Sequence, residues 1–250
     1  MTETTTLAEA LDESRFTLAM SSGFFGFYAH GGMLSALVDS GLTPDRVVGS
    51  SAGALIGGCF AAGLSVRQIR ELLFDLGRDD FWDPGIGFGL LAGRRMDDLL
   101  RQALPVDCFE ETSVPFACSA WHLRTRTTEI LDTGDLPRAL RASAAFPLLF
   151  QPVRVGDGLY LDGGIDDRPA FAPLGDGERT LYHHLATRSP WRRGEGARLD
   201  APTRTGVVSV DLGTLPRVGP FRLDEGRQAW RVSRKRMLRR LDEQVVDPGW

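Results

Sequence analysis

The first sixty residues contain two kinds of hydrophobic pattern, short apolar runs and apolar positions at helical spacing. Residues 16–20 form a short apolar run, and apolar side chains within 33–38 then recur at the spacing of one helix face. A second apolar run at 47–48 leads into the small, apolar stretch 54–62. The pattern predicts strand, helix, strand and helix in that order, which is typical of a parallel sheet with crossover helices.

The rest of the chain extends this arrangement. Residues 96–104 and 224–245 show the periodicity of amphipathic helices. Strand patterns lie at 116–121, 128–131, 159–161, 180–186 and 207–212. We therefore expect one α/β domain over residues 15–250, preceded by a polar, flexible N-terminus at 1–14.

The segment after the second apolar run carries the strongest chemical signal. Residues 49–53 read Gly-Ser-Ser-Ala-Gly, a G-x-S-x-G motif. A sharp strand-to-helix turn at such a motif exposes its central serine, Ser51, and Gly49 and Gly53 leave room for the turn. The N-terminus of the following helix favours a developing negative charge. The motif indicates a serine nucleophile.

A second glycine-containing turn lies upstream, where residues 21–26 read Ser-Ser-Gly-Phe-Phe-Gly. Strand-to-helix turns of a parallel sheet share one edge, so this turn can supply the N–H donors of an oxyanion hole beside Ser51. A dinucleotide-binding G-x-G-x-x-G is disfavoured, because Ser21 replaces its first glycine.

The partner of the serine is less evident. Asp162 ends the apolar strand at 159–161 and precedes Gly163 and Gly164, so it is either a general base or a turn aspartate bonded to its own backbone. The chain has four histidines, each more typical of a structural or surface position than of catalysis. They are His30, His122, His183 and His184.

Four segments, in this order, resemble the patatin-like phospholipases, with a likeness that covers residues 16–175. They are the turn at 21–26, the motif at 49–53, Ala-Ser-Ala-Ala-Phe-Pro at 142–147 leading to Pro152, and Asp-Gly-Gly at 162–164. The resemblance implies a three-layer α/β/α fold with a mainly parallel central sheet.

The resemblance also implies a chemistry, in which Ser51 is the nucleophile and Asp162 its partner in a Ser-Asp dyad. No histidine, metal or organic cofactor is then required, and the substrate is a carboxylic ester of a phospholipid, a lysophospholipid or an acylglycerol. The oxyanion hole maps onto the backbone of Ser22, Gly23, Phe24, Phe25 and Gly26.

Two positions depart from the family pattern. Ser21 and Ser22 stand where the family usually has consecutive glycines, and a serine is strained if either position needs a positive φ. Phe25 replaces a residue that is often basic, as in the branch of the family that acts on neutral lipids.

Charge, apolar runs and cysteine content indicate which classes of partner and which cellular compartment to expect. A net charge of −4 argues against a general nucleic-acid binder. The acidic N-terminus is unlike a signal peptide, and no run reaches eighteen apolar residues. The three cysteines, an odd number without C-x-x-C spacing, are typical of a reduced, cytoplasmic protein.

Two segments are candidates for contact with lipid. The aromatic and glycine-rich segment 81–91 is either a lid at an acyl pocket or an irregular connection packed on the core. The helix at 224–245 has seven basic residues between Arg227 and Arg240, and an apolar stripe that includes Trp230. It either lies on an anionic membrane surface or docks on the domain by that stripe.

Three functions follow from these observations. The first is a lipid acyl hydrolase with the Ser51–Asp162 dyad. The second is an α/β-hydrolase esterase in which His183 or His184 completes a triad, although Ser51 comes early in the chain for that fold. The third is a lipid- or membrane-binding module of the same fold without turnover.

Overall fold

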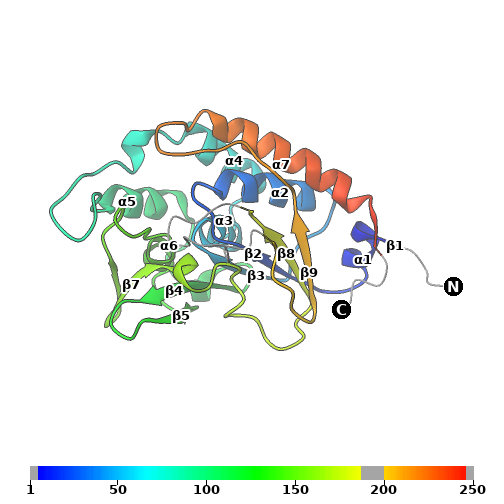
Figure 1. The fold of residues 1–250 in the computed structure, drawn as a ribbon, viewed down its shortest axis with the longest axis horizontal. Coiled ribbons are helices and arrows are strands. Elements are labelled where there is room, and N and C mark those ends of the chain that lie inside the picture. The colour runs from blue at the N-terminus through cyan, green and yellow to red at the C-terminus, as the bar shows by residue number, and fades with distance from the viewer. Residues whose placement is uncertain (1–4, 187–199, 246–250) are drawn as a thin grey trace.

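A computed structural model describes residues 5–186 and 200–245 (Figure 1). Its centre is an eight-stranded sheet of order β6-β7-β4-β3-β2-β8-β9, with β5 paired to β4. The strands are β2 (Thr17–Met20), β3 (Arg46–Ser50), β4 (Phe116–His122), β5 (Thr127–Leu131), β6 (Val153–Val155), β7 (Gly158–Asp162), β8 (Thr180–His184) and β9 (Val207–Asp211).

Most of this sheet is parallel, as the sequence predicts. Strands β4, β3, β2, β8 and β9 all run in one direction. Strands β5 and β7 pair with β4 in the opposite direction, and β6 pairs antiparallel with β7. The C-terminal end of the parallel strand β3 therefore lies close to the C-terminal end of the antiparallel strand β7.

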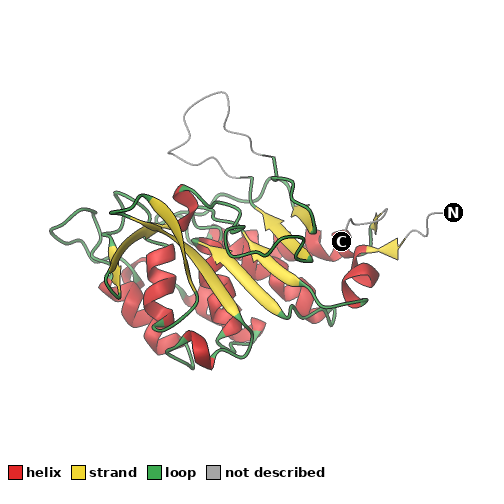
Figure 2. Ribbon diagram, turned by 90° about the horizontal axis from the view of Figure 1, so that it is seen from below, coloured by secondary structure: helices red, strands yellow, loops and turns green. Residues whose placement is uncertain are grey.

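Helices pack on one face of the sheet, and a thinner layer of turns covers the other (Figure 2). The helices are α1 (Leu7–Asp12), α2 (Phe27–Asp39), α3 (Ala52–Ala61), α4 (Val66–Asp75), α5 (Arg94–Ala103), α6 (Leu136–Ser143) and α7 (Glu225–Leu241). On the other face, the apolar cluster around Tyr182 includes Leu174 and Phe171, from the segment that follows the short 3₁₀ turn η3 (Gly163–Ile165). The fold is the three-layer α/β architecture expected.

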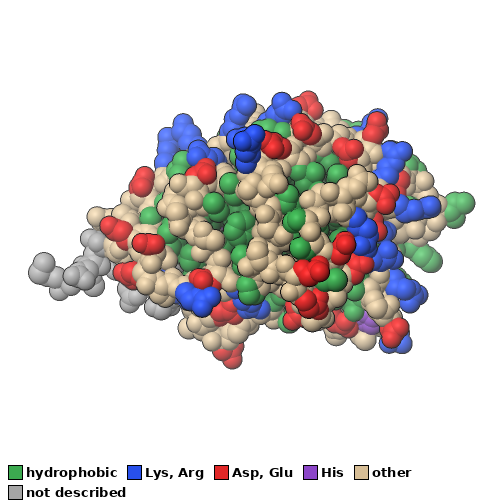
Figure 3. Space-filling model, turned by 180° about the vertical axis from the view of Figure 1, so that it is seen from behind, with side chains coloured by type: hydrophobic (Ala, Val, Ile, Leu, Met, Phe, Trp, Pro, Cys, Tyr) green, Lys and Arg blue, Asp and Glu red, His purple; other side chains and the backbone are tan. Residues whose placement is uncertain are grey.

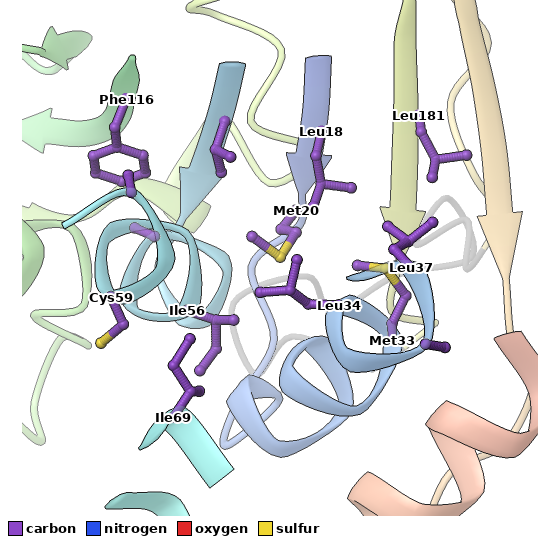
Figure 4. Packing of buried hydrophobic residues seen from close by; sticks show 14 of the residues in the cluster. Leu18, Met20, Met33, Leu34, Leu37, Ile56, Cys59, Ile69, Phe116 and Leu181 are labelled. Carbon is purple, nitrogen blue, oxygen red and sulfur yellow. The ribbon is translucent and has the colours of Figure 1, made fainter. Parts of the chain in front are cut away.

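The main core lies between the sheet and the helices. Figure 4 shows Met33, Leu34 and Leu37 of α2 directed at the side chains of β2 and β8, with Ile56 of α3 near Ile69 of α4. This burial removes apolar surface from water and fixes both helices that begin at the sheet edge.

Helix α7 lies across α2 on the side away from the sheet (Figure 1). Trp230 and Met237 are buried, and a Cβ at Gly31 would overlap the Trp230 ring. Every residue from Tyr28 to Leu37 is buried because α2 has a helix on one side and the sheet on the other. The apolar stripe of α7 thus packs in the core and is not available to a membrane. Contact between the basic face of this helix and a membrane surface stays a prediction.

The N-terminus also differs from the expectation of a flexible segment at 1–14. The side chain of Thr6 and that of Glu9 form a capping box that starts α1, and the side chains of Leu7 and Leu11 are buried. The strand β1 (Thr5–Thr6) pairs with β10 (Gln244–Val245). The apolar pattern does not reveal this helix because it is short and buries three residues, Leu7, Ala10 and Leu11. Residues 1–4 lie outside the described part.

Candidate active site

Strands β3 and β7 pair with successive parts of the same edge of β4, because β5 pairs with its other edge. Ser50 is the register partner of Ser119 in β4, and the adjacent Ala120 is the partner of Asp162 in β7. Ser51 and Asp162 therefore meet although they are far apart in the chain. The Ser51 hydroxyl donates a hydrogen bond of 2.6 Å to Oδ2 of Asp162.

Ser51 occupies a sharp turn with an unusual backbone. Its φ of 53° and ψ of −115° lie outside the regions that non-glycine residues prefer. A Cβ at Gly49 would lie 2.5 Å from the Ala54 backbone nitrogen, and one at Gly53 would overlap the backbone of Met20 in β2. The two glycines thus allow α3 to start directly against the sheet, as the motif predicts.

Asp162 is buried, with 5% of its surface exposed. Burial raises the pKa of this carboxyl to about 6, against the opposing effect of hydrogen bonds from Ser51 and from the Gly164 N–H. The Gly164 N–H donates to Oδ1 at 2.8 Å and leaves Oδ2 facing the serine. Asp162 is thus a turn residue through Oδ1 and a hydrogen-bond partner of Ser51 through Oδ2, and its role as general base stays a prediction.

The buried side chain of Ser143 connects the turn at Ser51 to strand β4. The Ser143 hydroxyl accepts a hydrogen bond from the Ser51 N–H at 3.0 Å and donates one of 2.7 Å to the Ser119 carbonyl. Ser143 lies at the end of α6 within the segment 142–147. The sequence therefore indicates this segment, but it does not predict the hydrogen bond to the Ser51 N–H.

The turn at 21–26 lies beside Ser51, and its N–H groups divide into two sets. The Ser22 N–H already donates to the Arg168 carbonyl and the Gly26 N–H to the Gly23 carbonyl, both at 2.8 Å. Within the described residues, the N–H groups of Gly23, Phe24 and Phe25 have no acceptor. The expected set of five donors therefore narrows to three.

The departure from consecutive glycines does not strain this turn. Ser21 and Ser22 both avoid positive φ, and the positive value of 53° falls on Phe25. The Ser21 hydroxyl accepts a hydrogen bond from the Leu185 N–H, and its carbonyl accepts one from Nε2 of His30. The serine thus ties the turn to β8.

No histidine joins Ser51 and Asp162. The partners of the Asp162 carboxylate are Ser51 and Gly164. His183 pairs with His30, and Nδ1 of His184 bonds the Tyr182 hydroxyl. His122 contacts Thr125. The geometry therefore gives no support to the Ser-Asp-His triad.

An apolar pocket opens at the serine and runs between α3, α4 and α5. Besides Ser51 and Asp162, its walls include Leu55, Cys59, Ile69, Leu73, Phe81 and Met96. Of the aromatic segment expected at 81–91, Phe81 lines the pocket, whereas residues 84–90 form an irregular loop outside it. An apolar pocket beside a serine that is hydrogen-bonded to a buried carboxylate suits an acyl chain.

Comparison with known proteins agrees with this arrangement. Residues 18–174 match the patatin-like phospholipase family, a span that includes Ser51, Asp162 and the turn at 21–26. The chain belongs to this family. Within residues 5–186 and 200–245, no three metal-ligating side chains gather, and no helix has the length and apolar character needed to cross a membrane.

Individual relatives support the same family. An uncharacterized NTE family protein of Mycobacterium tuberculosis is 33% identical over 172 residues, which are 64% of this chain and 45% of that protein. Lysophospholipase NTE1 of Mycosarcoma maydis is 24% identical over 70% of this chain and 10% of its own length. The chain thus spans less than half of these relatives.

A solved structure shares the fold. VipD from Legionella pneumophila superimposes with a TM-score of 0.66 at 14% sequence identity, over 92% of this chain and 68% of that one. This likeness confirms the three-layer architecture of the patatin-like family.

Proposed function

We propose that this patatin-like protein hydrolyses carboxylic esters of lipids through a dyad of Ser51 and Asp162. The observation that carries the proposal is the hydrogen bond of 2.6 Å from the Ser51 hydroxyl to a buried carboxylate at the mouth of an apolar pocket. A carboxylate whose pKa is raised to about 6 is still ionised at neutral pH and is a stronger base than an exposed aspartate.

The reaction would proceed in two halves. Ser51 Oγ attacks the ester carbonyl carbon while Asp162 Oδ2 accepts the hydroxyl proton. The negative oxygen that forms lies against the free N–H groups of Gly23, Phe24 and Phe25, each worth about 3 kcal/mol to the transition state. The carbon–oxygen bond then breaks, and Asp162 returns the proton to the leaving alcohol.

Water completes the cycle by the same route in reverse. It attacks the acyl-enzyme carbonyl and gives its proton to Asp162, and the fatty acid leaves as Ser51 recovers its hydroxyl proton. Gly164 keeps the carboxylate in one orientation throughout, because its N–H holds the oxygen that does not face the serine.

The apolar pocket supports a lipid substrate, and Lysophospholipase NTE1 is a relative named for such an activity. Phe25 at the mouth adds an apolar wall where the family often has a basic residue. We propose that the substrate is a carboxylic ester of a phospholipid, a lysophospholipid or an acylglycerol, whose acyl chain would occupy this pocket.

Labelling by a fluorescent fluorophosphonate tests the activated serine, and release of fatty acid from a lysophospholipid tests the substrate class. The wild type should label, Ser51→Ala should lose all signal, and Asp162→Asn should lose at least about 100-fold in labelling rate. Ser50→Ala is the matched control, since Ser50 is the neighbouring serine inside β3.

The outcomes separate the candidate functions. Labelling that persists in Asp162→Asn would contradict the dyad. A folded wild type that binds lipid vesicles but neither labels nor releases fatty acid would instead be the lipid-binding module without turnover. Equal labelling of the wild type and Ser51→Ala would place the reactive residue elsewhere.

A further inference from the structure

Four large apolar side chains point into solvent at the end of the molecule opposite α1. Ile86, Phe88 and Leu90 are 106%, 92% and 50% exposed, and Leu148 is 78% exposed. Figure 1 shows the loop between α4 and α5 projecting from that end, and Figure 3 shows hydrophobic side chains protruding there. We call these four residues the apolar tip.

The apolar tip is held in place by the backbone. The Leu90 N–H donates to the Leu148 carbonyl at 3.0 Å, and the Gly85 N–H donates to the Leu90 carbonyl at 3.1 Å. The Gln151 side-chain amide donates to the Ile86 carbonyl at 3.1 Å. The two segments of the tip therefore act as one unit and present their side chains without needing to fold on contact.

The base of the loop is anchored as well. The Asp83 carboxylate accepts the N–H groups of Gly93 and Arg94 at 2.9 and 2.7 Å, at the start of α5. Buried Arg141 donates to the Ala92 carbonyl at 2.6 Å. Between these anchors, residues 84–92 read Pro-Gly-Ile-Gly-Phe-Gly-Leu-Leu-Ala, without a charged or polar side chain.

The apolar tip adjoins the mouth of the acyl pocket. Leu148 is followed directly by Leu149 and Phe150, which line the pocket, and the Leu91 N–H donates to the Leu149 carbonyl at 2.7 Å. Phe24, also 43% exposed, packs against Phe146 at the same mouth. The exposed apolar surface is thus continuous with the entrance to the serine.

We propose that the apolar tip inserts into the interfacial layer of a lipid bilayer and sets the pocket mouth against the membrane. The proposal rests on the proposed function, in which the substrate is a lipid. Exposed isoleucine, phenylalanine and leucine gain free energy on leaving water. A lipid then reaches Ser51 along a continuous apolar surface.

The observations favour a bilayer over other occupants. The tip projects as an uncharged loop, whereas a protein interface needs a broad surface of matched shape. Helix α7, which carries the cluster of basic residues, lies along a different side of the molecule (Figure 1). Because residues 84–92 carry no charge, binding through the tip should resist salt, whereas binding through the arginines of α7 should not.

Co-sedimentation with phosphatidylcholine vesicles tests the proposal, in a Ser51→Ala background that leaves the lipid intact. The parent should bind equally well at about 0.1 M and about 1 M salt. The double variant Ile86→Ser/Phe88→Ser should bind at least about tenfold more weakly. The matched control is Leu123→Ser/Ile130→Ser, two exposed apolar residues on the β4–β5 hairpin, which should bind within about twofold of the parent.

A second reporter measures depth. In Phe88→Trp, the added fluorescence should shift to the blue with vesicles and be quenched by brominated phosphatidylcholine. Unchanged binding in the tip variant, an equal loss in the control pair, or loss of binding at high salt would each overturn the proposal. A dimer that the tip variant dissociates would assign the tip to a second copy of the chain instead.

The same variants separate this proposal from the proposed function. In the active Ser51 protein, Ile86→Ser/Phe88→Ser should hydrolyse monomeric p-nitrophenyl butyrate at the wild-type rate and lose activity only on vesicles. Vesicle binding without hydrolysis of either substrate would contradict the proposed function and leave the membrane tip supported.

Discussion

The Nδ1 atoms of His30 and His183 lie 2.8 Å apart in a pair that is closed to solvent. Nε2 of His30 faces the Ser21 carbonyl, which can only accept, so this nitrogen carries the proton. His30 Nδ1 then accepts the proton of His183 Nδ1. Burial lowers the pKa of His30 to about 4 and that of His183 well below its usual value, so both rings are neutral.

The first prediction is that His30 positions the turn that carries the free N–H groups. His30→Phe removes the donor to the Ser21 carbonyl and should lower kcat about 10- to 100-fold with little change in KM. The free energy of unfolding should fall by about 2 kcal/mol, because a buried carbonyl loses its partner. Steady-state kinetics on p-nitrophenyl butyrate and urea unfolding measure both effects.

His122→Phe is the matched control for this prediction. His122 is also buried, but its hydrogen bond goes to Thr125, just after the C-terminal end of β4. This variant should lose stability without the fall in kcat. Equal kinetic losses in the two variants would show that His30 acts through stability alone.

The second prediction concerns the pH dependence of catalysis. Asp162 must be ionised to accept the serine proton, and burial raises its pKa to about 6. For a soluble ester, kcat/KM should therefore rise with pH through a single limb near pH 6 and level off above pH 7. A limb near pH 4 would indicate an unperturbed aspartate and contradict the buried base.

The third prediction is that the ionised Asp162 destabilises the fold. Its folded pKa of about 6 lies above the unfolded value of 3.8, so its stabilising contribution is full below pH 4 and is lost as pH rises through 6. At about 1.4 kcal/mol per pH unit, the loss is about 3 kcal/mol above pH 7. Asp162→Asn should therefore be more stable than the wild type at pH 8.

Thermal unfolding at several pH values checks this prediction. The advantage of Asp162→Asn should shrink steadily between pH 6 and pH 4, since over that range the wild-type aspartate is protonated in the folded protein and still ionised in the unfolded chain. Asp166→Asn, at a nearby exposed aspartate, provides the control and should show no such trend. An advantage that is constant with pH would mean that it does not arise from ionisation.

The sequence predicted the parts of the site that depend on local pattern. Ser51 follows from the turn that Gly49 and Gly53 permit, and Asp162 stands at the end of a readable strand. Contacts between distant segments were not predictable. Ser143 holds the Ser51 N–H across 92 positions, and Arg168 occupies the Ser22 N–H through its carbonyl. Neither contact can be predicted from the hydrophobic periodicity or from the spacing of a motif in the sequence.

The C-terminal helix also shows that local patterns are predictable from the sequence, whereas contacts between distant segments are not. Its basic face and its apolar stripe are visible in the sequence, but a stripe that faces a membrane and one that faces a neighbouring helix look alike. Only the placement of Trp230 over Gly31 and Gly32 of α2 decides between them. Trp230 and the two glycines are about 200 positions apart in the chain. The glycines make room for the indole ring, but they form no sequence pattern that would predict this contact.

The fourth prediction is that Cys59 limits the length of acyl chain that the pocket accepts. Ser51, Leu55 and Cys59 line the pocket along one face of α3, so Cys59 lies about 12 Å from the serine along the helix axis. Burial raises the pKa of its thiol to about 12, which makes it an inert wall. Cys59→Phe fills this end of the pocket, whereas Cys59→Ala removes the thiol and keeps the space.

A series of p-nitrophenyl esters from butyrate to palmitate measures this effect. In Cys59→Phe, kcat/KM for the long esters should fall about tenfold or more relative to butyrate, because the bulky ring displaces the end of the chain. Cys59→Ala should keep the wild-type profile or shift it to longer chains. A profile lowered equally for all lengths would instead indicate that the phenylalanine disturbs α3 and with it the serine turn, since overpacking strains the helix as a whole.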